Sequence, residues 1–303
     1  MSLPFEIIVD SPYSEFIDIQ DDRFNNKRSL CIANDFEDGK WRLSRFIDFI
    51  FDNLGETALN ARERKALGKM AHSKLKAAAK KLRITDNDIA GGEISEILLY
   101  GIMRHHYNAL PIVPKIYYKQ NANDYAKGAD SVHIVIESDD TFSLWLGEAK
   151  FYNGFTNSQL DKIVESVLET LGTEKIKKEN SIIIGLSDIH ELGLNDELKE
   201  NIFELLNEEV SIDKIKRILH IPICLLHECS ITNNTTVFDN EYLIKLQSQY
   251  KDVAHRYFEK QLASCENKIA NYSQIIFHFI LFPVPIKADI VNEFINTAQF
   301  YRK

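Results

Sequence analysis

The sequence predicts an α/β protein with a mixed central sheet flanked by helices and a smaller, mainly helical region at the N-terminus. Two observations support this prediction. Beyond residue 90, segments with helical spacing of apolar residues alternate with short runs of β-branched and aromatic residues, which is the element order of α/β folds. In addition, 45% of the 303 residues are apolar and 27% are charged, a globular composition that excludes general disorder.

Charge divides the chain into two regions. The net charge is −9, yet residues 61–83 hold nine basic residues and one acid, a local charge of +8 that leaves −17 on the rest. Turn and capping residues follow at 84–88. We therefore expect an N-terminal region of residues 1–85 and an α/β domain of residues 86–303.

In the N-terminal region, residues 1–35 have the pattern of short strands and loops, and residues 40–54 have the apolar spacing of a helix. Residues 61–83 are rich in good helix formers and predict one basic amphipathic helix. Its basic face consists of Arg62, Lys65, Lys69, Lys76, Lys80 and Arg83. Such a face binds phosphates or an acidic partner, or it is simply solvated, and the sequence leaves these interpretations open.

The second region has the order α-β-β-β-α-β, with these elements expected at residues 92–108, 111–119, 129–137, 142–150, 157–171 and 181–187. The second and third of these strands form a predicted hairpin through the turn at 138–141. Asn157 or Ser158 is the expected cap of the following helix. The last third predicts two helices, a strand, a long helix, a strand and a final helix, at residues 195–208, 211–219, 220–228, 240–270, 274–284 and 286–301.

Three charged residues lie at one end of the predicted hairpin. Asp130 opens its first strand, and Glu148 and Lys150, two residues apart, project from one face of its second strand. Antiparallel pairing brings the start of one strand beside the end of the other, so we expect the three side chains to meet. On spacing alone, a solvated ion pair at a strand end explains them equally well.

A metal-dependent phosphodiesterase requires the same arrangement. Two carboxylates can hold a hard cation such as Mg²⁺ (or Mn²⁺) next to a phosphate, and the backbone carbonyl of Ala149 can add a ligand. The metal polarises the phosphate and lowers the pKa of a bound water. A lysine such as Lys150 can orient that water or neutralise the charge that develops.

An Asp that is followed one hairpin later by Glu-x-Lys, within an α-β-β-β-α-β order, resembles the PD-(D/E)XK nuclease superfamily. The resemblance implies that the first helix adds an acidic residue, for which Glu93 is the candidate and Glu96 stands nearby. It also implies a polar residue on the helix after Glu-x-Lys, for which Gln159 and Lys162 are the candidates. The chain departs from the superfamily pattern in having Ala129, not proline, before the Asp.

A closer resemblance, to the HamA family of Hachiman antiphage defence systems, rests on short blocks in the same order between residues 85 and 303. These blocks are GGEISEILLY, KGADSVHI, LWLGEAKFY, HIPICLLHE and FHFILFPVP. It implies a DNase that a superfamily 2 helicase partner (HamB-like) restrains and then releases on aberrant DNA. Two alternatives stay open: a non-catalytic DNA- or partner-binding module on a degenerate nuclease fold, and a restriction or repair nuclease.

The absence of several sequence motifs disfavours other classes of protein. No Gly-rich phosphate loop or GxGxxG occurs, so we expect no nucleotide bound by this chain through those motifs. No apolar run reaches the ~18 residues of a membrane span, and the N-terminus lacks the pattern of a secretion signal. The four cysteines have no CxxC spacing and are expected as free thiols. We therefore expect a cytoplasmic protein that acts on DNA.

Overall fold

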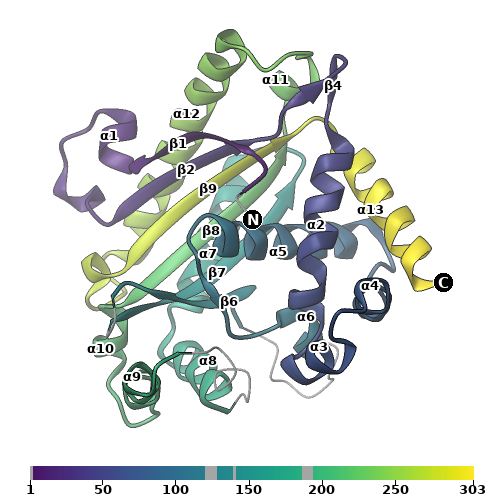
Figure 1. The fold of residues 1–303 in the computed structure, drawn as a ribbon. Coiled ribbons are helices and arrows are strands. Elements are labelled where there is room, and N and C mark those ends of the chain that lie inside the picture. Colours follow the sequence, from purple (N-terminus) through teal and green to yellow (C-terminus); the bar gives the residue numbers. More distant parts are fainter. Residues whose placement is uncertain (1–2, 120–127, 139–140, 186–193) are drawn as a thin grey trace.

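The computed structural model describes residues 3–119, 128–138, 141–185 and 194–303. Its centre is a seven-stranded mixed sheet in the order β1-β2-β9-β8-β7-β6-β5 (Figure 1). The strands are β1 (Glu6–Pro12), β2 (Lys27–Ala33), β5 (Leu110–Pro111), β6 (Ser131–Ile136), β7 (Phe142–Tyr152), β8 (Leu219–Glu228) and β9 (Ile276–Val284). The four inner strands β2, β9, β8 and β7 pair in parallel, and the outer strands pair antiparallel. The predicted α/β class with a mixed sheet is confirmed.

Helices cover both faces of the sheet, because its inner strands are apolar on both sides (Figure 1). One face packs against α1 (Tyr13–Ile17), α7 (Asn157–Thr170), α8 (Thr173–Gly185), α9 (Asp196–Leu206), α10 (Ile212–Lys216) and α12 (Asn240–Cys265). The other packs against α2 (Leu43–Ala58), α4 (Ala71–Lys80), α5 (Asn87–His105) and α13 (Lys287–Arg302). The remaining short elements are α3 (Ala61–Leu67), α6 (Lys115–Lys119), α11 (Ser230–Asn233) and the ribbon β3 (Phe36–Glu37) with β4 (Lys40–Trp41).

The N-terminal region is part of the same sheet and core. Strand β2 pairs in parallel with β9, with Leu30 opposite Ile280, and β1 lies beyond it at the edge. The ring of Phe5 lies 4.9 Å from the rings of both Phe49 and Phe282, measured between centroids. The boundary expected near residue 85 therefore separates neither two sheets nor two cores.

Three predicted elements have a different form in the structure. The basic segment is two helices, because Gly68 ends α3 with a φ of 49°, in the left-handed region. The expected strand at 111–119 is the short β5 followed, after Pro114, by α6. The expected strand at 181–187 falls in helix α8 up to Gly185, with residues 186–187 outside the described part. Buried Ile176, Asn180 and Ile183 are spaced four and three apart, which is helical spacing.

The α-β-β-β-α-β order survives this change, with a different last strand. It runs α5, β5, β6, β7 and α7, with the short helix α6 inserted between β5 and β6. After α8, α9 and α10 the chain enters β8, which pairs in parallel with β7. This is the nuclease-like arrangement that the resemblance implies. All four cysteines are buried free thiols. Among the described residues, no helix combines the length and apolar character needed to cross a membrane.

Candidate active site

The hairpin of β6 and β7 brings Asp130 to Glu148 and Lys150. Ser131 pairs with Gly147 at the end of the ladder, and the backbone N–H of Asp130 donates to the carbonyl of Gly147 at 2.7 Å. Asp130 therefore lies one position further along, beside Glu148. Side chains alternate along β7, so Glu148 and Lys150 share the face covered by α7, while Ala149 and Phe151 pack in the core beneath α5.

Lys150 lies between the two carboxylates. Its Nζ is 3.2 Å from Oδ2 of Asp130 and 3.2 Å from Oε2 of Glu148. The side chain of Glu148 is 5% exposed, that of Asp130 is 18% exposed and that of Lys150 is 32% exposed. The cluster is therefore buried at Glu148 and opens to solvent at Lys150.

Helix α7 holds the Glu148 carboxylate in place. The hydroxyl of Thr170 donates to Oε1 at 2.7 Å, and the hydroxyl of Ser166 donates to Oε2 at 2.8 Å. Sequence reasoning missed both residues. A signal existed, because Thr170 continues the buried spacing of Ile163 and Val167 along α7, and a hydroxyl on an apolar face needs a polar partner.

Burial and charge set the pKa of each group. Burial, and then the neighbouring charge of Asp130, raise the pKa of Glu148 above its ordinary value, although Lys150 and the two hydroxyls oppose this. Burial alone would lower the pKa of Lys150, but the carboxylates of Asp130 and Glu148 raise it above its ordinary value. Two carboxylates thus lie against one ammonium.

The backbone of Ala149 contributes to the same site. Its N–H donates to Oδ2 of Asp130 at 3.0 Å, past the last ladder pair of β6. In a strand, the N–H and C=O of one residue point to the same edge. The Ala149 carbonyl therefore faces the edge where β6 has ended, on the side of Asp130.

These donors fit a hard divalent cation. Oxygen atoms from two carboxylates and a carbonyl are the ligands that Mg²⁺ and Mn²⁺ prefer, and Mg²⁺ commonly uses one or two carboxylates with phosphate and water. Within the described ranges, no three His, Cys, Asp or Glu side chains gather as a metal-binding group. Asp130, Glu148 and the Ala149 carbonyl are the residues that would hold the ion.

Helix α5 brings Glu96 to a cavity that Asp130 also lines, and Glu93 of the same helix pairs with Arg83. Glu93 is 1% exposed, and its Oε1 accepts from Nε of Arg83 at 3.0 Å. One turn later, Glu96 and Asp130 line the same small cavity of about 10 Å³, together with Tyr100, Lys115 and Ser131 among others. About one water would fill such a cavity. Glu93, the acidic residue expected at the metal site, therefore forms an ion pair with Arg83, a residue of the predicted basic face.

Gln159 lies at the start of α7, away from the carboxylates. Its Oε1 accepts from the backbone N–H of Thr156 at 2.8 Å, and the hydroxyl of Thr156 accepts from the N–H of Gln159 at 3.2 Å. This is a capping box, so Thr156 is the N-cap in place of Asn157 or Ser158. The side chain of Gln159 serves the helix end in the structure.

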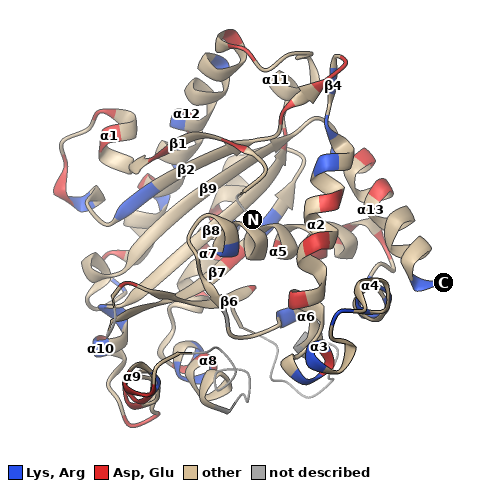
Figure 2. Cartoon of the chain, in the orientation of Figure 1, with Lys and Arg blue, Asp and Glu red and all other residues tan. Residues whose placement is uncertain are grey.

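The basic residues form a surface on α3, on α4 and on the segments that follow these two helices (Figure 2). Arg62, Lys65, Lys69, Lys80 and Arg83 are exposed, whereas Lys76 is half-buried and its Nζ donates to the carbonyl of Lys303 at 2.6 Å. Helix α6 separates this surface from the carboxylates. Nζ of Lys81 lies 4.2 Å from the ring centroid of Tyr117 on α6.

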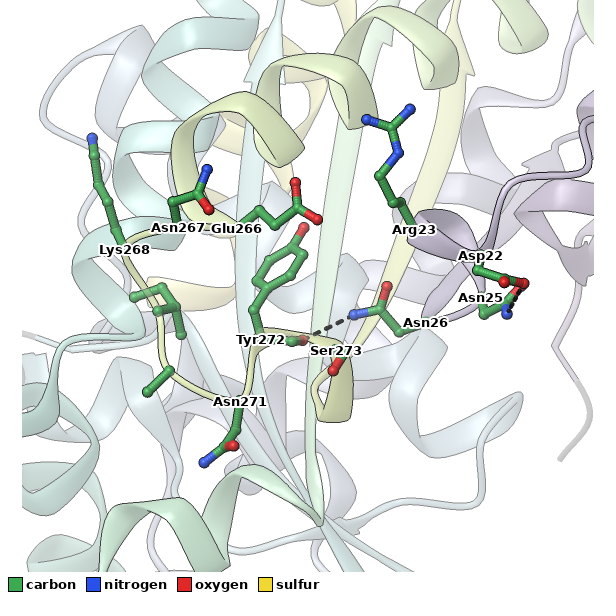
Figure 3. Close-up of a pocket in the computed structure, with 12 residues that line it drawn as sticks. Asp22, Arg23, Asn25, Asn26, Glu266, Asn267, Lys268, Asn271, Tyr272 and Ser273 are labelled. Atoms are coloured by element: carbon green, nitrogen blue, oxygen red, sulfur yellow. Dashed lines mark hydrogen bonds between the residues drawn. The ribbon is translucent and has the colours of Figure 1, made fainter.

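A larger cavity lies elsewhere, between the segment after α12 and the start of β2 (Figure 3). It has a volume of about 880 Å³ and a mixed lining that includes Arg23, Glu266 and Lys268. Behind it, the fully buried ammonium of Lys27 donates to the Tyr272 hydroxyl at 2.5 Å. None of the predicted catalytic residues lines this cavity.

Comparison with known proteins gives one finding. A search among curated proteins returned no match. A family model described as HamA matches residues 11–298, which is nearly the whole chain and includes Asp130, Glu148 and Lys150. The chain therefore belongs to the HamA family and is an antiphage defence protein related to Hachiman.

Proposed function

We propose that this chain is a metal-dependent DNase, the nuclease effector of its defence system, with Asp130, Glu148 and Lys150 at the active site. One observation carries the proposal: two carboxylates, one just before β6 and one on β7, converge on one partly exposed ammonium. A structural ion pair needs only one carboxylate. The second carboxylate supplies a further oxygen ligand, and a pair of carboxylates is what a hard divalent cation such as Mg²⁺ commonly uses.

Each residue of the cluster has a distinct role in the proposed reaction. Asp130, Glu148 and the Ala149 carbonyl would hold Mg²⁺ or Mn²⁺, and the bound ion would supply polarisation of the scissile phosphate and a lowered pKa of a bound water. Lys150 stays protonated at neutral pH because its pKa is raised. It therefore suits electrostatic stabilisation of the charge that develops on the phosphate better than the role of a base. Glu96 is the acidic residue of α5 best located to support Asp130.

Plasmid digestion by the purified chain tests this proposal. We expect Mg²⁺-dependent cleavage that EDTA abolishes and that Glu148→Gln and Lys150→Met reduce at least ~10³-fold. Glu165→Gln, which changes an exposed residue of α7, is the matched control and should cleave like the parent. Parent-like cleavage by folded Glu148→Gln would exclude this site.

Membership of the HamA family supports a further part of the proposal, a superfamily 2 helicase partner that restrains the nuclease until it meets aberrant DNA. If the isolated chain does not cut, the same digestion with the co-expressed helicase and damaged DNA is the deciding assay. Activity there, lost in Glu148→Gln, would support a restrained enzyme. No cleavage and no Mg²⁺ binding under either condition would favour a non-catalytic module.

We also propose that exposed residues of α3 and α4 contact DNA phosphates. Residues 61–83 carry +8 in a chain that is otherwise strongly negative, and they lie one short helix from Asp130. Replacing Arg62, Lys65 and Lys69 by Gln should weaken DNA binding at all sequences and reduce its salt dependence by about one unit of slope per lost contact. An unchanged slope, with loss of helicase binding, would instead assign this surface to the partner.

A further inference from the structure

The segment that leads into Asp130 is held by a buried ion pair outside the carboxylate cluster. Lys115, at the start of α6, lies 2.9 Å through its Nζ from both carboxylate oxygens of Glu179 on α8. The side chains are 4% and 3% exposed. Because burial of two charges removes them from water, such a pair stabilises a fold little compared with well-packed apolar residues. Its presence therefore needs another explanation.

A backbone hydrogen bond supplies that explanation. Oε1 of Glu179 also accepts from the N–H of Ala129 at 2.9 Å, one residue before Asp130. Neighbouring strand β5 pairs only with Ile134 and His133 of β6, so it ends well before Ala129. The buried Ala129 N–H has no ladder partner on that side, and the Glu179 carboxylate takes the place of the missing strand.

Gly128 makes this approach possible. A Cβ atom at residue 128 would lie 1.6 Å from Oε1 of Glu179, so any side chain there would displace the carboxylate. The backbone on each side of Asp130 is thus fixed: its own N–H binds Gly147, and the preceding N–H binds Glu179. Lys115 neutralises Glu179 and also lines the cavity beside Asp130.

We propose that Glu179 is a positioning residue, which holds the entry to β6 so that the Asp130 carboxylate meets Glu148 and Lys150, with Lys115 as its counter-ion. The expected effect of Glu179 on metal binding rests on the proposed function. Its expected effect on the backbone at Ala129 does not. For this role, Glu179 needs only an oxygen atom that accepts the hydrogen bond from the Ala129 N–H. The negative charge itself is needed only because Lys115 is buried beside it.

Two double variants of the full-length chain separate these parts. Lys115→Met with Glu179→Gln removes both charges but keeps an amide oxygen for the Ala129 N–H. Lys115→Met with Glu179→Leu removes both charges and the acceptor. Both keep side-chain volume, so both are expected to fold, which circular dichroism checks. Gly128→Ala is an independent third variant that displaces the carboxylate without changing it.

Hydrogen exchange of the peptide that covers residues 128–138 is the first measurement, because it requires neither metal nor activity. We expect amide exchange near Ala129 to be at least ~10-fold faster in the Glu179→Leu double variant and in Gly128→Ala than in the Glu179→Gln double variant. Calorimetric titration with Mg²⁺ is the second. The same two variants should lose about 10-fold or more in Mg²⁺ affinity, as residues that orient metal ligands do, while the Glu179→Gln double variant stays close to the parent.

The outcomes are distinguishable. Equal exchange and equal Mg²⁺ affinity in the two double variants would overturn the positioning role, whatever the activity of the parent. Faster exchange in the Leu variant, in a parent that neither binds Mg²⁺ nor cleaves DNA, would support the positioning of Asp130 and count against the proposed function.

Discussion

The hydroxyls of Ser166 and Thr170 act on Glu148 alone, and their removal should change its ionisation. Both hydrogen bonds lower the pKa of Glu148 and so oppose the effect of burial. In Ser166→Ala or Thr170→Val, the pKa of Glu148 rises further. A protonated Glu148 cannot hold a cation, so the acid limb of the cleavage-rate profile should move to higher pH, with about 10-fold lower activity at neutral pH. Ser158→Ala, at an exposed site on α7, is the control; an acid limb unchanged in Thr170→Val would contradict this role.

Lys27 is a buried cation whose replacement should stabilise the chain. It is 0% exposed, its Nζ lies 4.1 Å from the ring centroids of Tyr272 and Phe277, and burial lowers its pKa well below the usual value. A lysine with a lowered folded pKa destabilises the fold as pH falls below its ordinary value. Lys27→Met should therefore raise the free energy of unfolding by about 1–3 kcal/mol at pH 7, and less near pH 10.5.

Urea denaturation at both pH values measures this effect. Lys268→Met, an exposed lysine at the nearby cavity, should change stability by less than about 0.5 kcal/mol. A loss of stability in Lys27→Met at pH 7 would mean that the aromatic contacts of the ammonium outweigh its desolvation.

At the scale of elements, the close packing of α5 on α2 depends on one glycine. A Cβ on Gly101 would lie 2.5 Å and 2.6 Å from ring atoms of Phe49, whereas a Cβ on Gly92, in the same helix, would have no neighbour within 4 Å. Gly101→Ala should lower the free energy of unfolding by about 1–3 kcal/mol. Gly92→Ala should raise it by about 0.5–1 kcal/mol through helix propensity. Thermal or urea unfolding measures both, and a neutral Gly101→Ala would show that Phe49 moves aside readily.

Elements could be predicted from the sequence where their pattern is local. The hairpin of β6 and β7 follows from two apolar runs around a turn, and its pairing fixes Asp130 beside Glu148. The segment at 181–187 was wrongly predicted as a strand because adjacent isoleucines suit both structures, and the longer spacing from Ile176 to Ile183 favours a helix. The break at Gly68 was missed because helix formers flank it on both sides.

At the scale of the whole molecule, the pairing of β2 with β9 could not be predicted, because it joins segments almost the whole chain apart. No local pattern encodes such a contact, and the basic segment between them suggested a boundary instead. The same contrast between local and distant contacts explains why only part of the site could be predicted. Asp130, Glu148 and Lys150 depend on one hairpin, whereas Ser166, Thr170 and Glu179 reach it from helices whose placement the sequence does not give.

Buried histidines should make the whole fold sensitive to acid. Burial lowers the pKa of His133 to about 3 and that of His227 to about 4. A lowered histidine pKa contributes stability that is present above about pH 6.5 and is lost as pH falls towards the folded pKa. At pH 4 these two residues together should remove about 6 kcal/mol, a large part of the stability of a typical domain.

Urea unfolding between pH 7 and pH 4 measures this loss. His133 packs on the ring of Tyr100, and within the described part of the chain neither of its nitrogens has a hydrogen-bond partner. His133→Phe should therefore remove about 3 kcal/mol of the loss of stability between pH 7 and pH 4, while His227 and the other buried histidines keep the rest. If the free energy of unfolding falls with pH as steeply in the variant as in the parent, other groups cause the acid sensitivity.

The location of the metal tests the central claim most directly. Crystals of the full chain soaked with Mn²⁺ give an anomalous signal from the ion itself. We expect a peak within roughly 2.2 Å of carboxylate oxygens of both Asp130 and Glu148, next to the Ala149 carbonyl, and no such peak in Glu148→Gln. Peaks only at other residues, or none at Mn²⁺ concentrations that support DNA cleavage, would contradict it.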